Sequence, residues 1–301
     1  MEIVGYRYWW FGGKWVDLGG MYTCLLAEIQ YLCVILSQPM KTIFWNTKRI
    51  NDIKIILSIL KEEVPEFLFL AEFTKDDFST FDKDLDDVDY EHYSNPGCGK
   101  IVIIKKKNLT DVDLSIQHND YSALYLKTLD IYLIALHMPS QMSYNLDALK
   151  YNLSEFKFGI EKHIGNSEQK SILLIGDFNV NPFESPIINY DGLSATNKTN
   201  FNVIKKYRGN ENQIYYNPTW KLYTNNSFPG TFKKTRPSNS VFDVIDHHYL
   251  DQVILSHKLL KRITKEEINT ITKTSEFDIF YIRKNKIKYS DHLPIKYEFQ
   301  I

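Results

Sequence analysis

The sequence predicts an α/β fold in which two β-sheets pack face to face and carry helices on both outer faces. From residue 42 onward, short apolar runs alternate with amphipathic segments, as buried strands and surface helices do. Hydrophobic residues make up 44% of the 301 residues, which is enough for a large core. The order of these segments divides into two halves, and each half fits a small sheet with external helices.

The first half begins with a predicted strand at residues 42–46 and a predicted helix at residues 48–63. Apolar side chains recur every three or four residues along that helix and form one face. Pro65 ends the helix, and the apolar run FLFLAE at residues 67–72 predicts a buried strand.

An acidic stretch follows at residues 76–91. It contains eight Asp and Glu residues with almost no basic partners, so self-repulsion predicts a solvated loop. The alternating Asp spacing is similar to a calcium-binding loop, but the glycine and closing glutamate of that motif are missing.

Three strands are predicted at residues 101–105, 121–127 and 131–137, and we expect them to form a largely antiparallel meander. A long amphipathic helix at residues 144–163 leads into SILLIGDFN, residues 171–179. This apolar run, bounded by a glycine, predicts a strand buried on both faces.

The last part of the chain supplies the remaining elements. Residues 195–207 predict a helix, and residues 210–242, rich in Asn, Pro, Ser and aromatic residues, predict a loop with short strand pieces. The final strands are predicted at residues 249–256, 277–282 and 293–299.

Residues 1–39 differ from the rest because they are dense in Trp, Tyr and Gly and follow neither a helical nor a strand period. We therefore expect an N-terminal extension at 1–39 and a catalytic domain at 40–301. The extension is either a dispensable product of an upstream start, with Met40 as the natural beginning, or an aromatic arm that docks on the domain.

Composition restricts the class of protein. The charges of the 36 basic and 37 acidic residues nearly cancel. The protein therefore lacks the overall positive charge that is typical of proteins that coat nucleic acid. The three cysteines form no CxxC pair, and the apolar segment at 24–36 is too short to span a bilayer. A cytoplasmic protein without a membrane span is the expectation, and the oligomeric state stays open.

Polar residues come at the ends of the predicted buried strands. Asp177 and Asn179 are two residues apart, so they share one side if the extended backbone continues past Gly176. The alternative is that Asp177 caps a turn. The complete set of strand-end residues is Asn46, Glu72, His137, Asp177, Asn179, Asp251, Asp291 and His292.

Six blocks that contain these residues resemble the endonuclease/exonuclease/phosphatase superfamily, of which deoxyribonuclease I is a member. They are FWN at 44–46, LAE at 70–72, LHMPS at 136–140, GDFNVNPFES at 176–185, LDQVILS at 250–256 and SDHLP at 290–294. The blocks follow the family's order, and FESPI after GDFN and the region around residues 215–232 look similar to bacterial members. The resemblance implies a deoxyribonuclease I-like four-layer sandwich of two mixed sheets and metal-dependent hydrolysis of phosphoesters.

The resemblance also implies a role for each residue. Glu72 would be the principal ligand of a metal ion, with Asp291 and Asn46 beside it. Oxygen ligands without cysteine suit Mg2+ or Mn2+ better than zinc.

Five residues would carry the chemistry by the same resemblance. His292, paired with Asp251, would act as a base or phosphate clamp, and Asp177 would orient or deprotonate the attacking water. Asn179 would donate a hydrogen bond to the phosphate. His137 would contact the phosphate from the other side or protonate the leaving oxygen.

The sequence narrows the class of substrate but does not identify the substrate. His137 stands where abasic-site endonucleases carry a Tyr-x-Pro-x-Gly block, which argues against abasic-site repair. Basic and aromatic residues that could line a nucleic-acid groove favour a nuclease, namely Lys233, Lys234, Arg236 and Trp220. The alternatives are a phosphatase or phosphodiesterase for a small or lipid phosphoester, of the sphingomyelinase or inositol phosphatase type, and a catalytically silent binding module.

Overall fold

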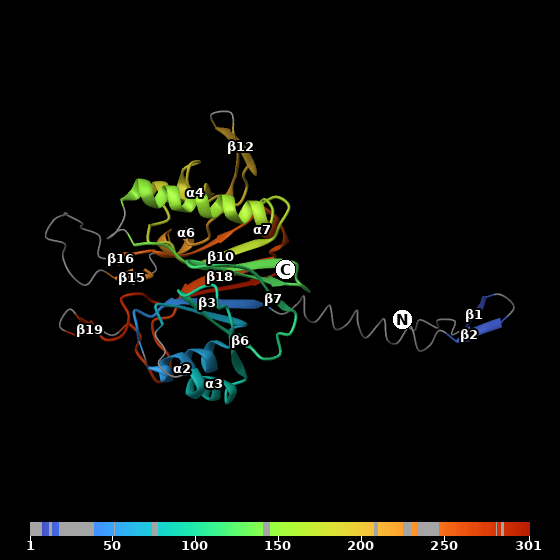
Figure 1. Cartoon of the computed structure of the whole chain (residues 1–301), viewed down its shortest axis with the longest axis horizontal. Helices are drawn as coiled ribbons and strands as arrows, with labels where there is room; N and C mark the ends of the chain where they lie inside the picture. The colour runs from blue at the N-terminus through green and yellow to red at the C-terminus, as the bar shows by residue number, and fades with distance from the viewer. Residues whose placement is uncertain are drawn as a thin grey trace.

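Two large β-sheets lie at the centre of the protein, and helices cover their outer faces (Figure 1). The structure, a computed structural model, describes residues 8–11, 14–17, 39–50, 52–73, 78–140, 145–207, 210–224, 230–233, 247–280, 282–283 and 286–301. Both sheets contain parallel and antiparallel neighbours. The predicted architecture of two packed mixed sheets flanked by helices is confirmed.

The first sheet has six strands. In spatial order they are β18 (Lys265–Thr270), β21 (Ile295–Gln300), β3 (Met40–Asn46), β4 (Phe67–Ala71), β6 (Ile101–Lys106) and β5 (Tyr90–Tyr93). Only β3 and β4 are parallel neighbours, and their register pairs Asn46 with Ala71. The carboxyl ends of both central strands therefore reach the same edge of the sheet.

The second sheet has seven strands. Their order is β11 (Ala195–Thr196), β14 (Tyr215–Tyr216), β17 (Asp251–Leu255), β10 (Ile172–Asp177), β9 (Ile131–His137), β8 (Tyr121–Leu126) and β7 (Val112–His118). Strand β10 is parallel to β9 and antiparallel to β17, and its register places Asp177 beside both His137 and Asp251. Three polar residues thus form a row along one edge.

Three hydrophobic clusters separate the layers. The cluster between the sheets contains side chains of both, such as Phe44, Phe69, Leu133 and Ile175. Burial of one such side chain stabilises the fold by about 1.5–3 kcal/mol. These contacts press the two sheets together.

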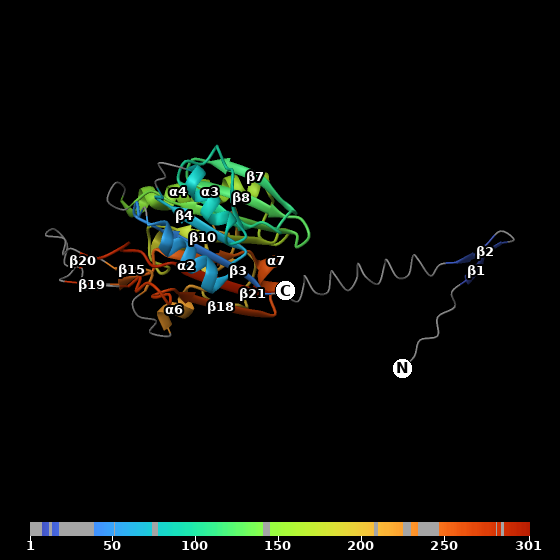
Figure 2. The ribbon, with the colours of Figure 1, turned by 90° about the horizontal axis from the view of Figure 1, so that it is seen from below.

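The other two clusters attach the helices. Leu153 and Phe156 of α4 (Leu146–His163) pack on the seven-stranded sheet. Helices α2 (Ile53–Glu63) and α3 (Phe78–Asp86) pack on the six-stranded sheet, and Figure 2 shows them from that side.

Shorter elements complete the described chain. They are the strand pairs β1 (Tyr8–Phe11) with β2 (Lys14–Asp17), β12 (Ile204–Tyr207) with β13 (Asn210–Gln213), β15 (Phe232–Lys233) with β16 (His247–His248) and β19 (Ile282–Arg283) with β20 (Lys286–Ile287), and helices α5 (Ser185–Ile188), α6 (Trp220–Thr224) and α7 (His257–Arg262). Within the described ranges, no helix combines the length and apolarity needed to cross a bilayer. The division at residues 39 and 40 stays a prediction.

The acidic stretch at 76–91 is not the solvated loop that its charge predicted. It contains α3 and β5, because Phe81 and Leu85 of α3 are completely buried against the six-stranded sheet. These two residues are four positions apart and form an apolar stripe. Burial of that stripe outweighs the repulsion among carboxylates that stay on the surface.

Other predicted elements were also wrong. Residues 195–207 contain β11 and β12 instead of a helix, because β11 gains a parallel partner in β14. Residues 277–280 form no strand, and only one isolated bridge joins Lys273 to Asp278. The strand at this edge of the six-stranded sheet is instead β18. Its sequence, KEEINT, is mostly polar, and only Ile268 of the six residues is buried.

The predicted meander combined strands of two different sheets. Strand β6 pairs with β4 and β5 in the six-stranded sheet, whereas β8 and β9 pair with each other and β8 pairs with β7. The sequence of β7, VDLSIQH, alternates polar and apolar residues but was not assigned to a strand.

A steric constraint explains why glycine precedes Asp177. A Cβ atom at Gly176 would lie 2.0 Å from the carbonyl oxygen of Leu136 on the neighbouring strand β9. No side chain fits at that distance, so the close parallel pairing of β9 and β10 requires glycine here.

We expect Gly176→Ala to lower the free energy of unfolding by at least about 2 kcal/mol, because the added methyl group must push β9 and β10 apart. Urea denaturation followed by circular dichroism measures the change. Gly159→Ala in α4 is the matched control: its Cβ would lie 3.7 Å from the hydroxyl of Tyr121 on β8, an ordinary contact distance. The control should be neutral or stabilise by up to about 1 kcal/mol, and equal losses for both variants would contradict the steric explanation.

Candidate active site

The strand-end residues of both sheets come together at one edge of the sandwich. Asn46 ends β3, Glu72 follows β4, His137 ends β9, Asp177 ends β10, Asp251 begins β17, and Asp291 and His292 precede β21. These residues come from segments far apart in the sequence. The parallel pairs β3–β4 and β9–β10 each place two strand ends at this edge.

Asn46 connects the two sheets. Its Nδ2 donates hydrogen bonds to Asp177 Oδ2 at 3.0 Å and to Glu72 Oε1 at 3.3 Å. The Asp177 side chain is 1% exposed, whereas that of Glu72 is 38% exposed. One amide therefore bridges a buried carboxylate of one sheet and a solvent-accessible carboxylate of the other.

The backbone around Asn46 and Glu72 adopts unusual conformations. Glu72 has a φ angle of 51°, and Lys48 and Arg49 have φ angles of 48° and 66°. Such left-handed conformations cost about 1–3 kcal/mol each in residues other than glycine and persist only where surrounding contacts hold them. One such contact is the hydrogen bond from the Arg49 N–H to the Glu72 carbonyl, 3.0 Å.

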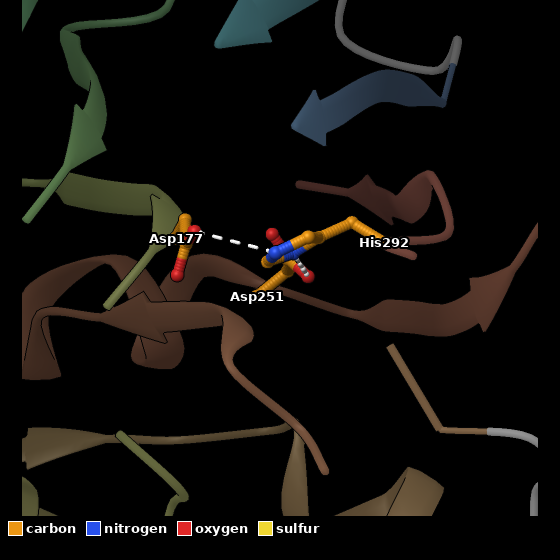
Figure 3. A group of neighbouring side chains, drawn as sticks. All are labelled: Asp177, Asp251 and His292. Carbon is orange, nitrogen blue, oxygen red and sulfur yellow. Dashed lines mark hydrogen bonds and ion pairs between the residues drawn. The ribbon is translucent and has the colours of Figure 1, made fainter. Parts of the chain in front are cut away.

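His292 lies between two carboxylates (Figure 3). Its Nδ1 is 2.8 Å from Asp251 Oδ2, and its Nε2 is 3.8 Å from Asp177 Oδ2. Burial lowers the pKa of His292, but the negative charges of Asp251 and Asp177 outweigh burial and raise it to about 9. Burial raises the pKa of Asp251 to about 7. Between those values the pair consists of an imidazolium and a carboxylate.

Two hydrogen bonds attach the SDH segment to β3, and a third lies within the segment. Ser290 Oγ donates to the Asn46 carbonyl at 2.7 Å and accepts from the His292 N–H at 3.0 Å. The indole Nε1 of Trp45 donates to the His292 carbonyl at 3.0 Å. The imidazole is thereby held by its own backbone as well as by Asp251.

His137 approaches the same two carboxylates from β9. Its Nε2 lies 3.6 Å from Glu72 Oε1 and 3.8 Å from Asp177 Oδ2. Its Nδ1 is buried and has no hydrogen-bond partner in the described part of the chain. The two imidazoles thus face Asp177 through their Nε2 atoms.

Asn179 does not continue the strand. Strand β10 ends at Asp177, and Asn179 has a left-handed φ of 55°. Its N–H donates to Asp177 Oδ1, 2.8 Å, and its Nδ2 donates to the Met138 carbonyl, also 2.8 Å. The expected same-side arrangement is therefore wrong. The alternative holds: Asp177 caps a turn, and its carboxylate also faces His137 and His292.

Lys48 was missed by the sequence prediction. Its ammonium forms an ion pair with Asp291 Oδ2, and its backbone N–H donates to Asn46 Oδ1 at 3.1 Å. The only signal was its place two residues after Asn46. A lysine near a strand end is usually solvated, so the sequence did not distinguish it.

Of the residues predicted to bind substrate, Lys233 contacts this group. The backbone N–H of Lys233 donates to the Asp291 carbonyl at 2.8 Å. The Trp220 ring packs 6.3 Å from Phe183 and 6.1 Å from Tyr223, centroid to centroid. Lys234 and Arg236 lie outside the described residues.

Asp177, Asp251 and His292 form a group that could hold a metal ion, because one ligand atom from each lies within 4.8 Å of the others. Both nitrogens of the His292 ring face carboxylates, which is the arrangement of a hydrogen-bonded proton carrier. The donors that suit Mg2+ or Mn2+ are instead the carboxylate oxygens that Asn46 bridges, since those ions prefer oxygen. The residues present therefore fit a hard divalent ion beside Glu72.

Comparison with known proteins shows the fold. No protein-family model and no curated protein matches the sequence. An AP endonuclease from Archaeoglobus fulgidus matches with a TM-score of 0.56 at 15% identity, over 87% of this chain and 100% of that chain. TDP2 of D. rerio, complexed with a single strand DNA product, matches with a TM-score of 0.56 at 16% identity, over 88% of this chain and 100% of that chain.

A truncated TDP2 from Caenorhabditis elegans matches with a TM-score of 0.53 at 16% identity, over 88% of this chain and 99% of that chain. These structural neighbours are enzymes with the endonuclease/exonuclease/phosphatase fold, and this chain shares that fold. The deoxyribonuclease I-like architecture predicted from the motif blocks is confirmed.

We expect the imidazole of His292 to titrate near pH 9. Because this value is above the ordinary pKa of about 6.5, the imidazolium stabilises the folded state fully below pH ~6.5, and the stabilisation is lost as the pH rises to about 9. Nitrogen-15 NMR of the ring measures the titration directly. Asp251→Asn removes the nearest negative charge and should move the pKa back toward 6.5. A wild-type ring that titrates near 6.5 would contradict this electrostatic account.

Proposed function

We propose that the protein is a Mg2+-dependent phosphoester hydrolase, with Mn2+ as a substitute, and that it is a nuclease that cleaves phosphodiester bonds of nucleic acid. The observation that carries this proposal is the surroundings of Asp177. Its carboxylate faces His137 and His292, each at 3.8 Å, and is bridged through Asn46 to Glu72. The site thus brings together a carboxylate that can accept a proton, an imidazole that can donate one and groups that can neutralise the negative charge of a phosphate.

Asp177 is the group we assign to the attacking water. Hydrogen bonds from Asn46 Nδ2 and the Asn179 N–H fix the orientation of its carboxylate. The water forms a bond to phosphorus while its proton passes to Asp177, as a general base requires. Asn179 acts through this backbone contact, and the assignment of its amide to the phosphate stays a prediction.

The two imidazoles serve the phosphate. The His292 imidazolium, held by Asp251, would stabilise the negative charge that grows on the phosphoryl oxygens. His137 Nε2 would give a proton to the leaving oxygen as the bond from phosphorus to that oxygen breaks. One proton is taken from water and one is delivered to the leaving group, so the reaction balances.

Glu72 would be the principal residue that holds the metal ion, and Asn46 would keep its carboxylate in place. The family resemblance also assigns Asp291 to the surroundings of this ion. A bound Mg2+ or Mn2+ polarises the phosphoryl oxygen and neutralises charge in the transition state. The exposure of the Glu72 side chain, 38%, leaves that carboxylate accessible to an ion and a substrate.

Nucleic acid is the substrate class we favour. The D. rerio TDP2 structure holds a single strand DNA product in a protein of the same fold. In this chain, the aromatic rings of Phe183, Trp220 and Tyr223 pack on one another and could stack on bases. Cytoplasmic location remains part of the proposal.

We expect metal-dependent hydrolysis of at least one substrate among single-stranded DNA, double-stranded DNA, RNA, bis-p-nitrophenyl phosphate and lipid phosphodiesters, and none in a chelator. Asp177→Asn should lower kcat by about 10²–10⁴ because the proton acceptor is lost. Asp113→Asn is the matched control, since Asp113 lies on β7 in an ion pair with Lys127 and its side chain is 56% exposed. Turnover of lipid phosphodiesters alone would replace the nuclease assignment, and no turnover of any substrate would refute the hydrolase.

A further inference from the structure

We propose that the Lys48 ammonium takes the place of a second metal ion in this site. It forms an ion pair with the Asp291 carboxylate, so that the site binds one divalent metal ion and not two. This inference rests on the proposed metal-dependent function and adds the number of ions. It gives Asp291 a different part from the metal-ligand role that the family resemblance implies.

The contact joins an exposed lysine side chain to a largely buried carboxylate. The Asp291 side chain is 10% exposed, and the Lys48 ammonium pairs with its Oδ2. An exposed lysine pair usually contributes only about 0–1 kcal/mol because water screens it. Here the carboxylate is largely removed from water, so leaving it without a cation costs more.

The backbone holds Lys48 in this position. Its N–H donates to Asn46 Oδ1 at 3.1 Å, so the same residue contacts Asn46 through its backbone and Asp291 through its side chain. The left-handed φ angles of Lys48 and Arg49 turn the chain here. The turn is closed by hydrogen bonds from the Ile50 N–H to the Thr47 carbonyl and from the Arg49 N–H to the Glu72 carbonyl, both 3.0 Å.

We infer the number of bound metal ions from the partners that the four carboxylates of the site already have. Asp251 is hydrogen-bonded to His292, and Asp291 is paired with Lys48. Glu72 and Asp177 are bridged by the neutral amide of Asn46. Two carboxylates that share a neutral bridge match the charge of one divalent ion, and removal of the Lys48 charge would leave a third carboxylate open to a second ion.

The test counts bound Mn2+ without substrate, by electron paramagnetic resonance of free Mn2+ and by calorimetry. Wild type and Lys48→Arg should bind one ion per chain. Lys48→Met, which keeps the length but not the charge, should bind a second ion or bind Mn2+ at least tenfold more tightly. Adding Asp291→Asn to Lys48→Met should remove that gain.

Arg49→Met is the control for net charge, since it removes one positive charge from the same turn without removing the ammonium that contacts Asp291. It should keep the wild-type count. Equal Mn2+ number and affinity in wild type and Lys48→Met would overturn the inference, as would two ions in wild type. Mn2+ counts as expected, without hydrolysis of any substrate, would overturn the proposed function and leave the role of Lys48 standing.

Discussion

The candidate site depends on the face-to-face packing of two sheets whose strand ends meet at one edge. The hydrogen bond from Asn46 Nδ2 to Asp177 Oδ2, 3.0 Å, crosses from one sheet to the other at that edge. It forms only if β3 and β10 stop at the same depth in the sandwich. The apolar cluster between the sheets sets that depth, and the parallel register of each sheet brings further strand ends to it.

Burial makes the polar groups at this edge interdependent. The Asp177 and Asp251 side chains are 1% and 0% exposed, and isolated carboxylates so far from water would cost several kcal/mol each. His292 lies between them and offsets that cost, while Ser290 and Trp45 fix its backbone. The same arrangement that makes the buried charges tolerable keeps an imidazolium beside the position we assign to the phosphate.

Conformational strain is also present at this edge. Glu72 and Asn179 have left-handed backbones, and Gly176 allows β10 to approach β9 more closely than any side chain permits. Both strained residues follow strands that the core holds firmly, so the packing of the sandwich offsets the strain. The strain turns the chain sharply after each strand and directs the polar groups toward the site.

Sequence pattern alone predicted the buried strands, the two-sheet architecture and the strand-end residues, because apolar runs and their polar ends are local features. It did not predict that the acidic α3 packs on a sheet or that the polar KEEINT is an edge strand, since both depend on what lies across a tertiary interface. The tertiary structure likewise determines which side chains of the site contact one another. Asn179 turns its amide to Met138, and Lys48 pairs with Asp291, 243 residues away. Such contacts follow from the depth and register of packed strands, which no local stretch of sequence contains.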